Sequence, residues 1–152
     1  MTEPRSDDDN TDIIWSDDAD DLEPEQLDGF FVGWPNPPNT ETHLRLLRGS
    51  SHVVMALVRR PAARPRVVGF ATAVSDGVLA AYVPLLEVLP EWQGRGLGRA
   101  LMQRMLERLR SLYMIDLLCD PPLQVFYEPL GMTRATGMLL RNYDRQSGQR
   151  RP

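Results

Sequence analysis

The stretch LPEWQGRGLGRALMQRMLERL, from Leu89 to Leu109, decides the fold because it places a flexible, cationic turn before an apolar-striped segment. Three glycines alternate along this turn, at Gly94, Gly96 and Gly98. Glycine has no Cβ, so the backbone there can approach a ligand closely. The first N–H groups of a helix lack carbonyl partners, and the helix macrodipole adds about half a positive charge. With Arg95 and Arg99 beside them, these groups predict an anion site of the phosphate type.

The residues after the turn predict a long amphipathic helix over 96–113. Its apolar stripe recurs at helical spacing, at Leu97, Leu101, Met105, Leu109 and Leu112. Two common phosphate loops are excluded. A P-loop requires a lysine, and all 17 basic residues of this chain are arginine. The dinucleotide fingerprint requires glycine at its sixth position, where this chain has Arg99 or Leu101, depending on the first glycine chosen.

Three strand-like segments precede the turn. Their β-branched and apolar runs predict strands over His52–Arg59, Arg66–Ser75 and Val78–Val88. The dipeptide Asp76-Gly77 predicts a hairpin turn between the last two. Pro84 predicts an irregularity or a bulge inside the third, because proline cannot donate to a ladder.

Shorter elements complete the chain. Helices are predicted over 20–31 with Asp20 or Asp21 as cap, over Thr40–Ser50 with Thr40 as cap, and over Asp120–Gly131 with Asp120 as cap. Strands are predicted over Ile13–Trp15, Met114–Cys119 and Thr136–Tyr143. This order predicts an α+β fold, a mixed and mostly antiparallel sheet flanked by helices.

Length and composition indicate one domain of 152 residues. We expect an acidic, disordered tail over 1–11, a domain over 12–145 and a frayed end over 146–152. Nine of the 21 acidic residues but only one base lie in Met1–Asp21, so the rest carries 12 acids and 16 bases. This mildly basic body suits a small polyanion and is too weakly charged to indicate nucleic acid. A single cysteine, a polar start and the lack of a membrane-spanning apolar run favour a cytoplasmic protein without membrane contact.

The segment Gln93–Gly98 matches the pattern Gln/Arg-x-x-Gly-x-Gly/Ala, and by it the chain resembles the GNAT N-acetyltransferase superfamily. Phe126–Met132 (FYEPLGM) is similar to that family's Phe-Tyr-x-x-x-Gly-Phe motif, and the likeness extends over about Ile13–Tyr143. It implies the GNAT fold and acetyl-CoA as cosubstrate, without a metal. Asp120 stands where the family often has asparagine toward the pantetheine arm, and Met132 replaces the usual phenylalanine.

The resemblance also implies where the cosubstrate binds. The strand before the turn would pair with pantetheine through its backbone, with Leu86 and Val88 as the best matches. The diphosphate would lie on the turn and the first helical amides. The implied residues of this second group are Gln93, Gly94, Arg95, Gly96, Leu97, Gly98 and Arg99.

Two side chains are predicted to carry the chemistry. Tyr127 matches the family's tyrosine beside the departing sulfur, and a phenol stays protonated at neutral pH, so it is the expected general acid. Glu87, on the strand leading to the cosubstrate, is the candidate general base for the acceptor ammonium, acting through water. The alternatives are a Tyr127 that only packs and a Glu87 that is an exposed strand carboxylate.

Other reactive or aromatic side chains have structural interpretations. His43 and His52 are expected to be structural, and Cys119 to be a small buried apolar residue rather than a nucleophile. Phe30, Phe31 and Trp34 are either the walls of an acceptor pocket or aromatic cover for the core.

The sequence thus predicts an enzyme that moves an acetyl group from acetyl-CoA directly to an amine in a ternary complex, with a small-molecule acceptor favoured. A non-catalytic acyl-CoA sensor or interaction module on the same fold is the alternative, and acetylation of protein N-termini is a third hypothesis that would require a long groove. The resemblance also allows a homodimer, with Thr136–Tyr143 as an edge strand.

Overall fold

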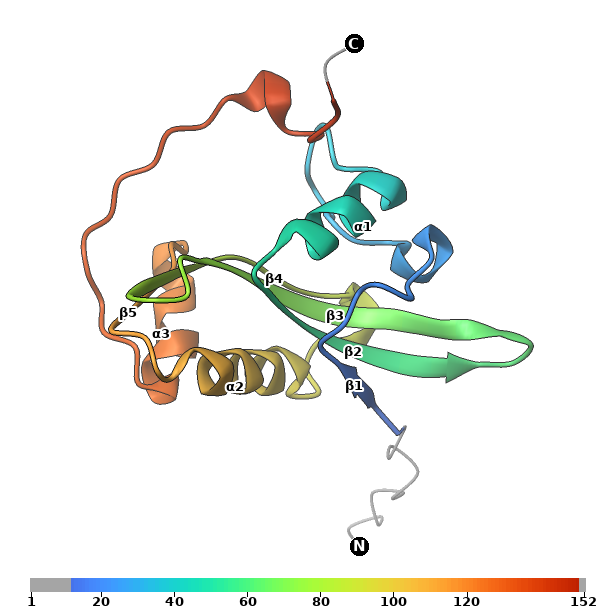
Figure 1. Cartoon of the computed structure of the whole chain (residues 1–152), viewed down its shortest axis with the longest axis horizontal. Coiled ribbons are helices and arrows are strands. Elements are labelled where there is room, and N and C mark those ends of the chain that lie inside the picture. The colour runs from blue at the N-terminus through green and yellow to red at the C-terminus, as the bar shows by residue number, and fades with distance from the viewer. Residues whose placement is uncertain (1–11, 151–152) are drawn as a thin grey trace, which may run out of the picture.

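The computed structural model describes residues 12–150 and contains a five-stranded sheet in the order β1-β2-β3-β4-β5 (Figure 1). The strands are β1 (Ile14–Ser16), β2 (His52–Arg60), β3 (Ala63–Ser75), β4 (Ala80–Val88) and β5 (Met114–Asp116). The α-helices are α1 (Thr40–Gly49), α2 (Leu97–Leu109) and α3 (Gln124–Tyr127). Five 3₁₀ turns complete the described elements, at Pro24–Leu27, Pro90–Trp92, Pro121–Leu123, Glu128–Leu130 and Tyr143–Arg145. The predicted mixed α+β fold is confirmed.

Strands β1 to β4 form an antiparallel meander. Asp76 stabilises the β3–β4 turn, because its carboxylate accepts hydrogen bonds from the backbone amides of Val78, Leu79 and Ala80, at 2.8–3.1 Å. Val74 pairs with Tyr82, but Thr72 pairs with Leu85, so β4 has one residue more than β3 between these pairs. Pro84 lies in this stretch, and the predicted irregularity is confirmed.

The link from β4 to β5 is a parallel crossover through α2. The two strands pair only from Ala80–Met114 to Tyr82–Asp116. Strand β4 continues for six more residues, to Val88, without a partner in β5. The last part of β4 therefore has one edge that no described strand occupies.

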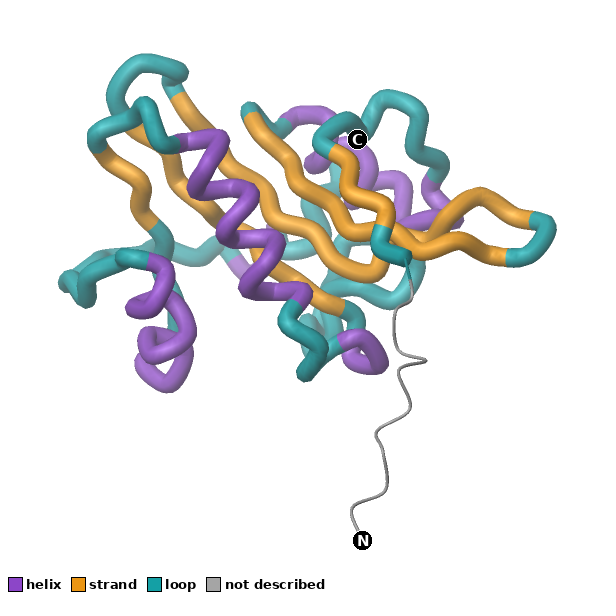
Figure 2. The backbone as a smooth tube through the Cα atoms, turned by 90° about the horizontal axis from the view of Figure 1, so that it is seen from below, coloured by secondary structure: helices purple, strands orange, loops and turns teal. Residues whose placement is uncertain are grey.

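Helices cover both faces of the sheet: α2 lies beneath it in Figure 1 and α1 lies above it. Figure 2 shows α2 lying against one face of the sheet, with its axis roughly along the strands. The apolar stripe of α2 packs into one core cluster with Val54, Ala71 and Val83 of the sheet. Leu44 and Leu47 of α1 pack into a second cluster around Phe70 and Met55. The sheet is thus buried on both faces, which explains the nearly continuous apolar runs of β2 and β3.

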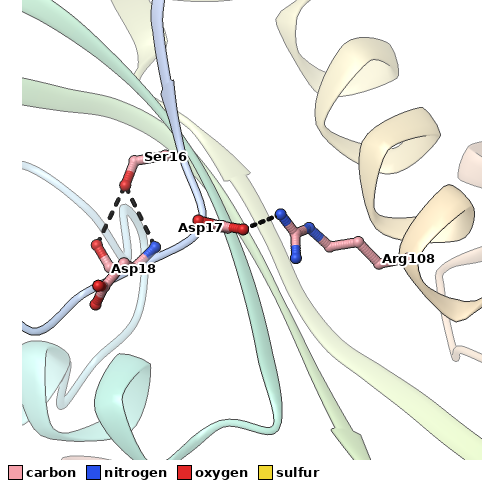
Figure 3. Close-up of polar contacts among 4 residues, drawn as sticks. All are labelled: Ser16, Asp17, Asp18 and Arg108. Atoms are coloured by element: carbon pink, nitrogen blue, oxygen red, sulfur yellow. Dashed lines mark hydrogen bonds and ion pairs between the residues drawn. The ribbon is translucent and has the colours of Figure 1, made fainter.

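An ion pair joins the acidic residues after β1 to the far end of α2. Arg108, in the last turn of α2, donates to the carboxylate of Asp17 (Figure 3). Ser16 beside it forms hydrogen bonds with the backbone of Asp18. Part of the acidic N-terminal region is therefore used within the fold.

The prediction of a final strand over Thr136–Tyr143 is wrong. Residues 132–142, which we call the arm, have no regular secondary structure and join no strand of the described sheet. Gln146 and Gly148, beyond the arm, accept hydrogen bonds from the backbone of Asn36 and the side chain of Arg45. The apolar pattern of the arm is that of a strand, but a strand also requires a partner.

Element ends differ from the sequence predictions where caps and short turns decide them. Asn39, not Thr40, caps α1, and its side chain accepts from the Thr42 amide at 2.8 Å. The predicted caps Asp20 and Asp21 are wrong, because Glu23 precedes the 3₁₀ turn there. Asp120 precedes its turn without a side-chain cap bond. No helix within residues 12–150 is long and apolar enough to cross a membrane, and the predicted tail over 1–11 lies outside the described residues.

Candidate active site

The glycine turn adopts a backbone that other residues rarely take. Gly94 and Gly96 have φ angles of 77° and 82°, in the left-handed region. A Cβ added to either glycine would meet no protein atom within 4 Å, so crowding by neighbouring groups is not the reason for glycine at these positions. Gly98 differs, since a Cβ there would come within 3.6 Å of Phe126. The turn is therefore bent by left-handed glycines and open on its outer side.

The turn leads into the N-terminus of α2. Its N-cap is Gly96, which has no side chain with which to occupy the first amides of the helix. The guanidinium of Arg95 lies 4.5 Å from the ring centre of Trp92, and Arg99 is exposed one turn further on. A helix N-terminus with two arginines beside it is a site for an anion.

Gln93 holds the turn to the sheet. Its side-chain amide donates to the carbonyl of Val88 at 3.0 Å, and its backbone N–H donates to the carbonyl of Pro90. Both polar donors of this residue are thus used inside the protein. Gln93 orients the turn, and the glycines and α2 carry the open amides.

The unpaired edge of β4 runs toward this turn. The Leu89 amide donates to Val68 in β3, and the backbone N–H and C=O groups of successive residues in a strand point to opposite edges. Leu86 and Val88 therefore direct their backbone groups away from β3, to the edge that β5 leaves unoccupied. The structure places both predicted backbone-pairing residues along this edge.

Tyr127 lies at the end of α3 and is half-buried against the α2 cluster. Its ring packs edge-on against Phe126, with centroids 4.9 Å apart, and Phe126 approaches Gly98 of α2. Burial raises the pKa of the Tyr127 phenol, and the nearby Cys119 raises it further. Tyr127 is therefore a protonated donor at neutral pH, on the same face of the sheet as α2.

Glu87 lies on the opposite face of β4. One carboxylate oxygen, Oε1, accepts a hydrogen bond from the Phe31 amide at 3.0 Å, and the other, Oε2, is buried without a partner in the described structure. Burial raises the pKa of Glu87, and the bond from Phe31 lowers it by less. The interpretation of Glu87 as an exposed strand carboxylate is wrong. A half-buried carboxylate with one unpaired oxygen can accept a proton.

Sequence reasoning did not find the contact that orients Glu87. Phe31 has a φ of 61°, which is uncommon for a residue with a large side chain, and this conformation presents its amide to Glu87. The two residues are 56 positions apart. The sequence near Phe31 indicates only a turn, at Asp28-Gly29. It does not indicate that the Phe31 amide would contact Glu87.

An aromatic cluster adjoins Glu87. His43 is 1% exposed and packs against three rings, with its ring centroid 4.6 Å from that of Phe70, 4.8 Å from that of Phe31 and 5.4 Å from that of Phe30. Burial lowers the pKa of His43 to about 4, so its ring is neutral at pH 7. His43 therefore belongs to the buried cluster, as the structural interpretation expects.

Phe30, Phe31 and Trp34 were predicted either to line an acceptor pocket or to cover the core, and the structure places them differently from one another. Phe31 is buried in the cluster, Phe30 is half-buried, and Trp34 is exposed with its ring 5.0 Å from that of Phe31. The hydroxyl of Thr72 is a further buried polar group without a partner. Since Phe70 pairs with Glu87 in the sheet, these groups lie on the α1 face beside the carboxylate.

Cys119 is half-buried rather than fully buried, which corrects the sequence prediction. It lies near enough to Tyr127 to affect the phenol's pKa. His52 lies at the start of β2 and lines a polar hollow with Asp17 and Arg108, at the opposite end of α2 from the glycine turn. Within residues 12–150, no group of three His, Cys, Asp or Glu side chains is placed to hold a metal ion.

The fold and the site define an α+β domain in which a glycine-bounded helix start, suited to an anion, lies beside an unpaired sheet edge. The chain belongs to the acetyltransferase (GNAT) family, whose model matches residues 19–132. The predicted family and fold are thus confirmed.

Known proteins agree with this assignment. A protein of Deinococcus radiodurans R1, provisionally described as an acetyltransferase, has a solved structure that is 47% identical over 99% of this chain and 100% of its own, with a TM-score of 0.86. An N-acetyltransferase of Pyropia yezoensis that is termed uncharacterized is 30% identical over 68% of this chain and 59% of its own. Serotonin N-acetyltransferase 2 of Oryza sativa subsp. japonica is 38% identical over 66% of this chain. This chain spans 59% and 50% of the lengths of these last two relatives.

Proposed function

We propose that this protein moves an acetyl group from acetyl-CoA to a small amine by direct transfer in a ternary complex. The open glycine turn at the start of α2 supports this most strongly. Its left-handed glycines leave space that a Cβ would fill, and no protein atom uses that space. A diphosphate fits such a place, because it is an anion that accepts several backbone hydrogen bonds.

The cosubstrate would supply an activated acetyl thioester. The amides from Gly94 to Arg99 would hold its diphosphate, with the two arginine side chains adding charge. The open edge of β4 would pair with its pantetheine amides through the backbone of Leu86 and the N–H of Val88, whose carbonyl already accepts from Gln93, and would offer one N–H to the thioester carbonyl. One such donor contributes about 3 kcal/mol to transition-state stabilisation.

Two side chains would move protons on opposite sides of β4. Tyr127, kept protonated by its raised pKa, donates from its hydroxyl to the leaving sulfur. Glu87 would accept the proton of the acceptor ammonium through water, which requires the α1 face to open, because its unpaired Oε2 is buried in the described structure. The acceptor would therefore enter from the α1 face, beside Phe30 and Trp34.

The acceptor class is inferred from the side chains around Glu87. They combine aromatic rings with one buried carboxylate, which suits a small ammonium ion attached to an apolar or aromatic group. The name of the rice relative gives serotonin, an aromatic amine, as that protein's substrate. A relative from Glycine max is named a histone acetyltransferase, so a peptide lysine belongs in any substrate panel.

Two measurements test the proposal. Thermal unfolding with coenzyme A at 100 times its Kd is expected to show about 2.7 kcal/mol of added stability. An amine panel with acetyl-CoA is then assayed for release of free thiol, with aliphatic, aromatic and peptide amines compared. Absence of a shift at millimolar coenzyme would overturn coenzyme binding. Binding without thiol release for any amine would instead identify the non-catalytic module of the same fold.

A further inference from the structure

Three buried polar atoms on the α1 side of the sheet make no hydrogen bond within residues 12–150. They are Oε2 of Glu87, Oγ1 of Thr72 and Nε2 of His43. Thr72 is 0% exposed and His43 is 1% exposed. Buried polar side chains in folded proteins almost always have a hydrogen-bond partner. Three such atoms on one face therefore indicate a site at which a ligand supplies the missing bonds.

The sheet places Thr72 and Glu87 near each other. Thr72 and Phe70 are two residues apart in β3, so both side chains point to the α1 face. Glu87 is opposite Phe70, and Leu85 is opposite Thr72. Glu87 and Thr72 are therefore diagonal neighbours across the two strands, which are typically about 7–8 Å apart. The carboxylate and the hydroxyl can thus bind one small molecule at two points.

The Phe31 amide shows how Glu87 binds a donor. It donates to Oε1 at 3.0 Å, and an N–H group of a ligand can take the same place. Phe31 has a φ of 61°, between Gly29 and Gly33 with φ angles of 95° and 83°. A strained residue of this kind is typical of segments that close over ligands, and the flanking glycines tolerate a change of backbone conformation. Residues 29–33 can therefore move when a ligand displaces the Phe31 amide.

The cover of the α1 face ends next to Thr72. Phe70, on one side of it in β3, is 0% exposed. Val74, on the other side and on the same face, is 56% exposed, and its partner Tyr82 is 37% exposed. Thr72 thus lies at the boundary between the covered and the open part of this face. A ligand at Glu87 and Thr72 would displace only the margin of the α1 layer.

The groups around the site define the chemistry of the ligand. A carboxylate attracts a cation, and a threonine hydroxyl donates or accepts a hydrogen bond. The rings of Phe30 and Phe31 favour an aromatic group beside the cation. Because the two polar groups are diagonal neighbours, the cation and a second polar group must lie close together in the ligand. A primary ammonium with a hydroxyl on the neighbouring carbon and an attached aromatic ring has this arrangement.

We propose that Glu87 and Thr72 form a two-point site for the acceptor, a short amino alcohol with an aromatic group. The ammonium replaces the Phe31 amide at Glu87, and the hydroxyl bonds to Oγ1 of Thr72. Thr72 thus determines specificity, because it favours a hydroxyl-bearing amine over the same amine without the hydroxyl. The inference rests on the proposed function, since it takes the ammonium at Glu87 as the acetyl acceptor, but binding alone tests the site.

Calorimetry compares two amines that differ by one hydroxyl, 2-amino-1-phenylethanol and 2-phenylethylamine. The full chain is titrated with each of them, with and without coenzyme A. The wild type is expected to bind the amino alcohol about tenfold more tightly, because only this amine gives the buried Thr72 hydroxyl a partner. Equal affinities for the two amines, or binding of neither at millimolar concentration, would overturn the proposal.

A pair of threonine variants assigns the preference. Thr72→Val removes the hydroxyl, keeps the shape of the side chain and should bind the two amines equally. It should be at least as stable as the wild type, because the hydroxyl has no protein partner to lose. The control is Thr42→Val, which alters an 8% exposed threonine of α1 and should keep the tenfold preference. A preference that survives in Thr72→Val, or a large loss of stability in that variant, would exclude Thr72 as the second binding point.

Hydrogen exchange of the Phe31 amide tests the replacement at Glu87. Saturating 2-amino-1-phenylethanol should make this amide exchange faster, and unchanged or slower exchange would contradict the displacement. Thiol release from acetyl-CoA separates this inference from the proposed function. A hydroxyl preference without thiol release would overturn acetyl transfer and support the site, whereas thiol release without a hydroxyl preference would overturn the site and support acetyl transfer.

Discussion

At the scale of single residues, the phenol of Tyr127 gives the sharpest chemical prediction. Tyr127→Phe keeps the ring that packs against Phe126 and removes only the hydroxyl. Loss of a general acid typically lowers the rate about 10²- to 10⁴-fold, so kcat should fall in this range with little change in stability. Steady-state kinetics and thermal unfolding measure the two effects. The matched control is Tyr113→Phe, at an 84% exposed tyrosine beyond α2, and equal kinetics in both variants would remove the acid role from Tyr127.

The carboxylate of Glu87 predicts a pH dependence. Because burial raises its pKa above the ordinary 4.5, a base function should appear as a loss of kcat/KM below a pH higher than 4.5. Glu87→Gln should lower kcat and abolish this acidic limb. Raised pKa also means that charging Glu87 disfavours the folded state, so the variant should be at least as stable at pH 7. Glu107→Gln, on the exposed face of α2, is the control, and an unaltered acidic limb in Glu87→Gln would contradict the assignment.

At the scale of elements, the glycine turn separates backbone strain from ligand binding. Gly96→Ala should destabilise the protein by about 1 kcal/mol, the cost of a side chain in the left-handed region. Gly77→Ala should cost the same, since Gly77 has a φ of 73° and its Cβ would also meet nothing within 4 Å. Only Gly96→Ala puts a methyl group where the diphosphate is proposed to lie. Calorimetry should therefore show at least a tenfold weaker coenzyme A affinity for Gly96→Ala and an unchanged affinity for Gly77→Ala.

The elements also show how far the sequence alone could reach. Strands β2 to β4 and helix α2 were predictable because their hydrophobic periodicity is a local property of the sequence. The glycine turn before α2 was predictable for the same reason, since the spacing of its glycines is also local. The 136–143 segment has the same local pattern as a strand, yet strand formation depends on a pairing partner, and no described strand pairs with this segment. The bond between Phe31 and Glu87 was not predictable either, because a contact over 56 residues depends on how the two layers pack.

At the scale of the whole molecule, the two cores on either face of the sheet differ in their tolerance of acid. The α2 core cluster contains only apolar residues, whereas His43 lies buried among the rings beside the α1 cluster. The buried imidazole is neutral in the folded state, where its pKa is lowered to about 4. In the unfolded chain His43 has the ordinary pKa of 6.5, so it binds a proton at a higher pH than in the folded state. His43 should therefore make the fold less stable as the pH falls.

The sign follows from this difference in proton binding. Above pH 6.5 both states hold His43 neutral and nothing is lost; as the pH falls from 6.5 to about 4, the unfolded state binds more protons and stability decreases. At 1.36 kcal/mol per pKa unit, the loss approaches about 3 kcal/mol by pH 4. Urea unfolding at pH 7.5 and at pH 4 should show this loss in the wild type. His43→Leu, which keeps an apolar side chain in the cluster, should reduce the difference by that amount, and parallel pH profiles for the two proteins would show that the acid sensitivity of the fold lies elsewhere.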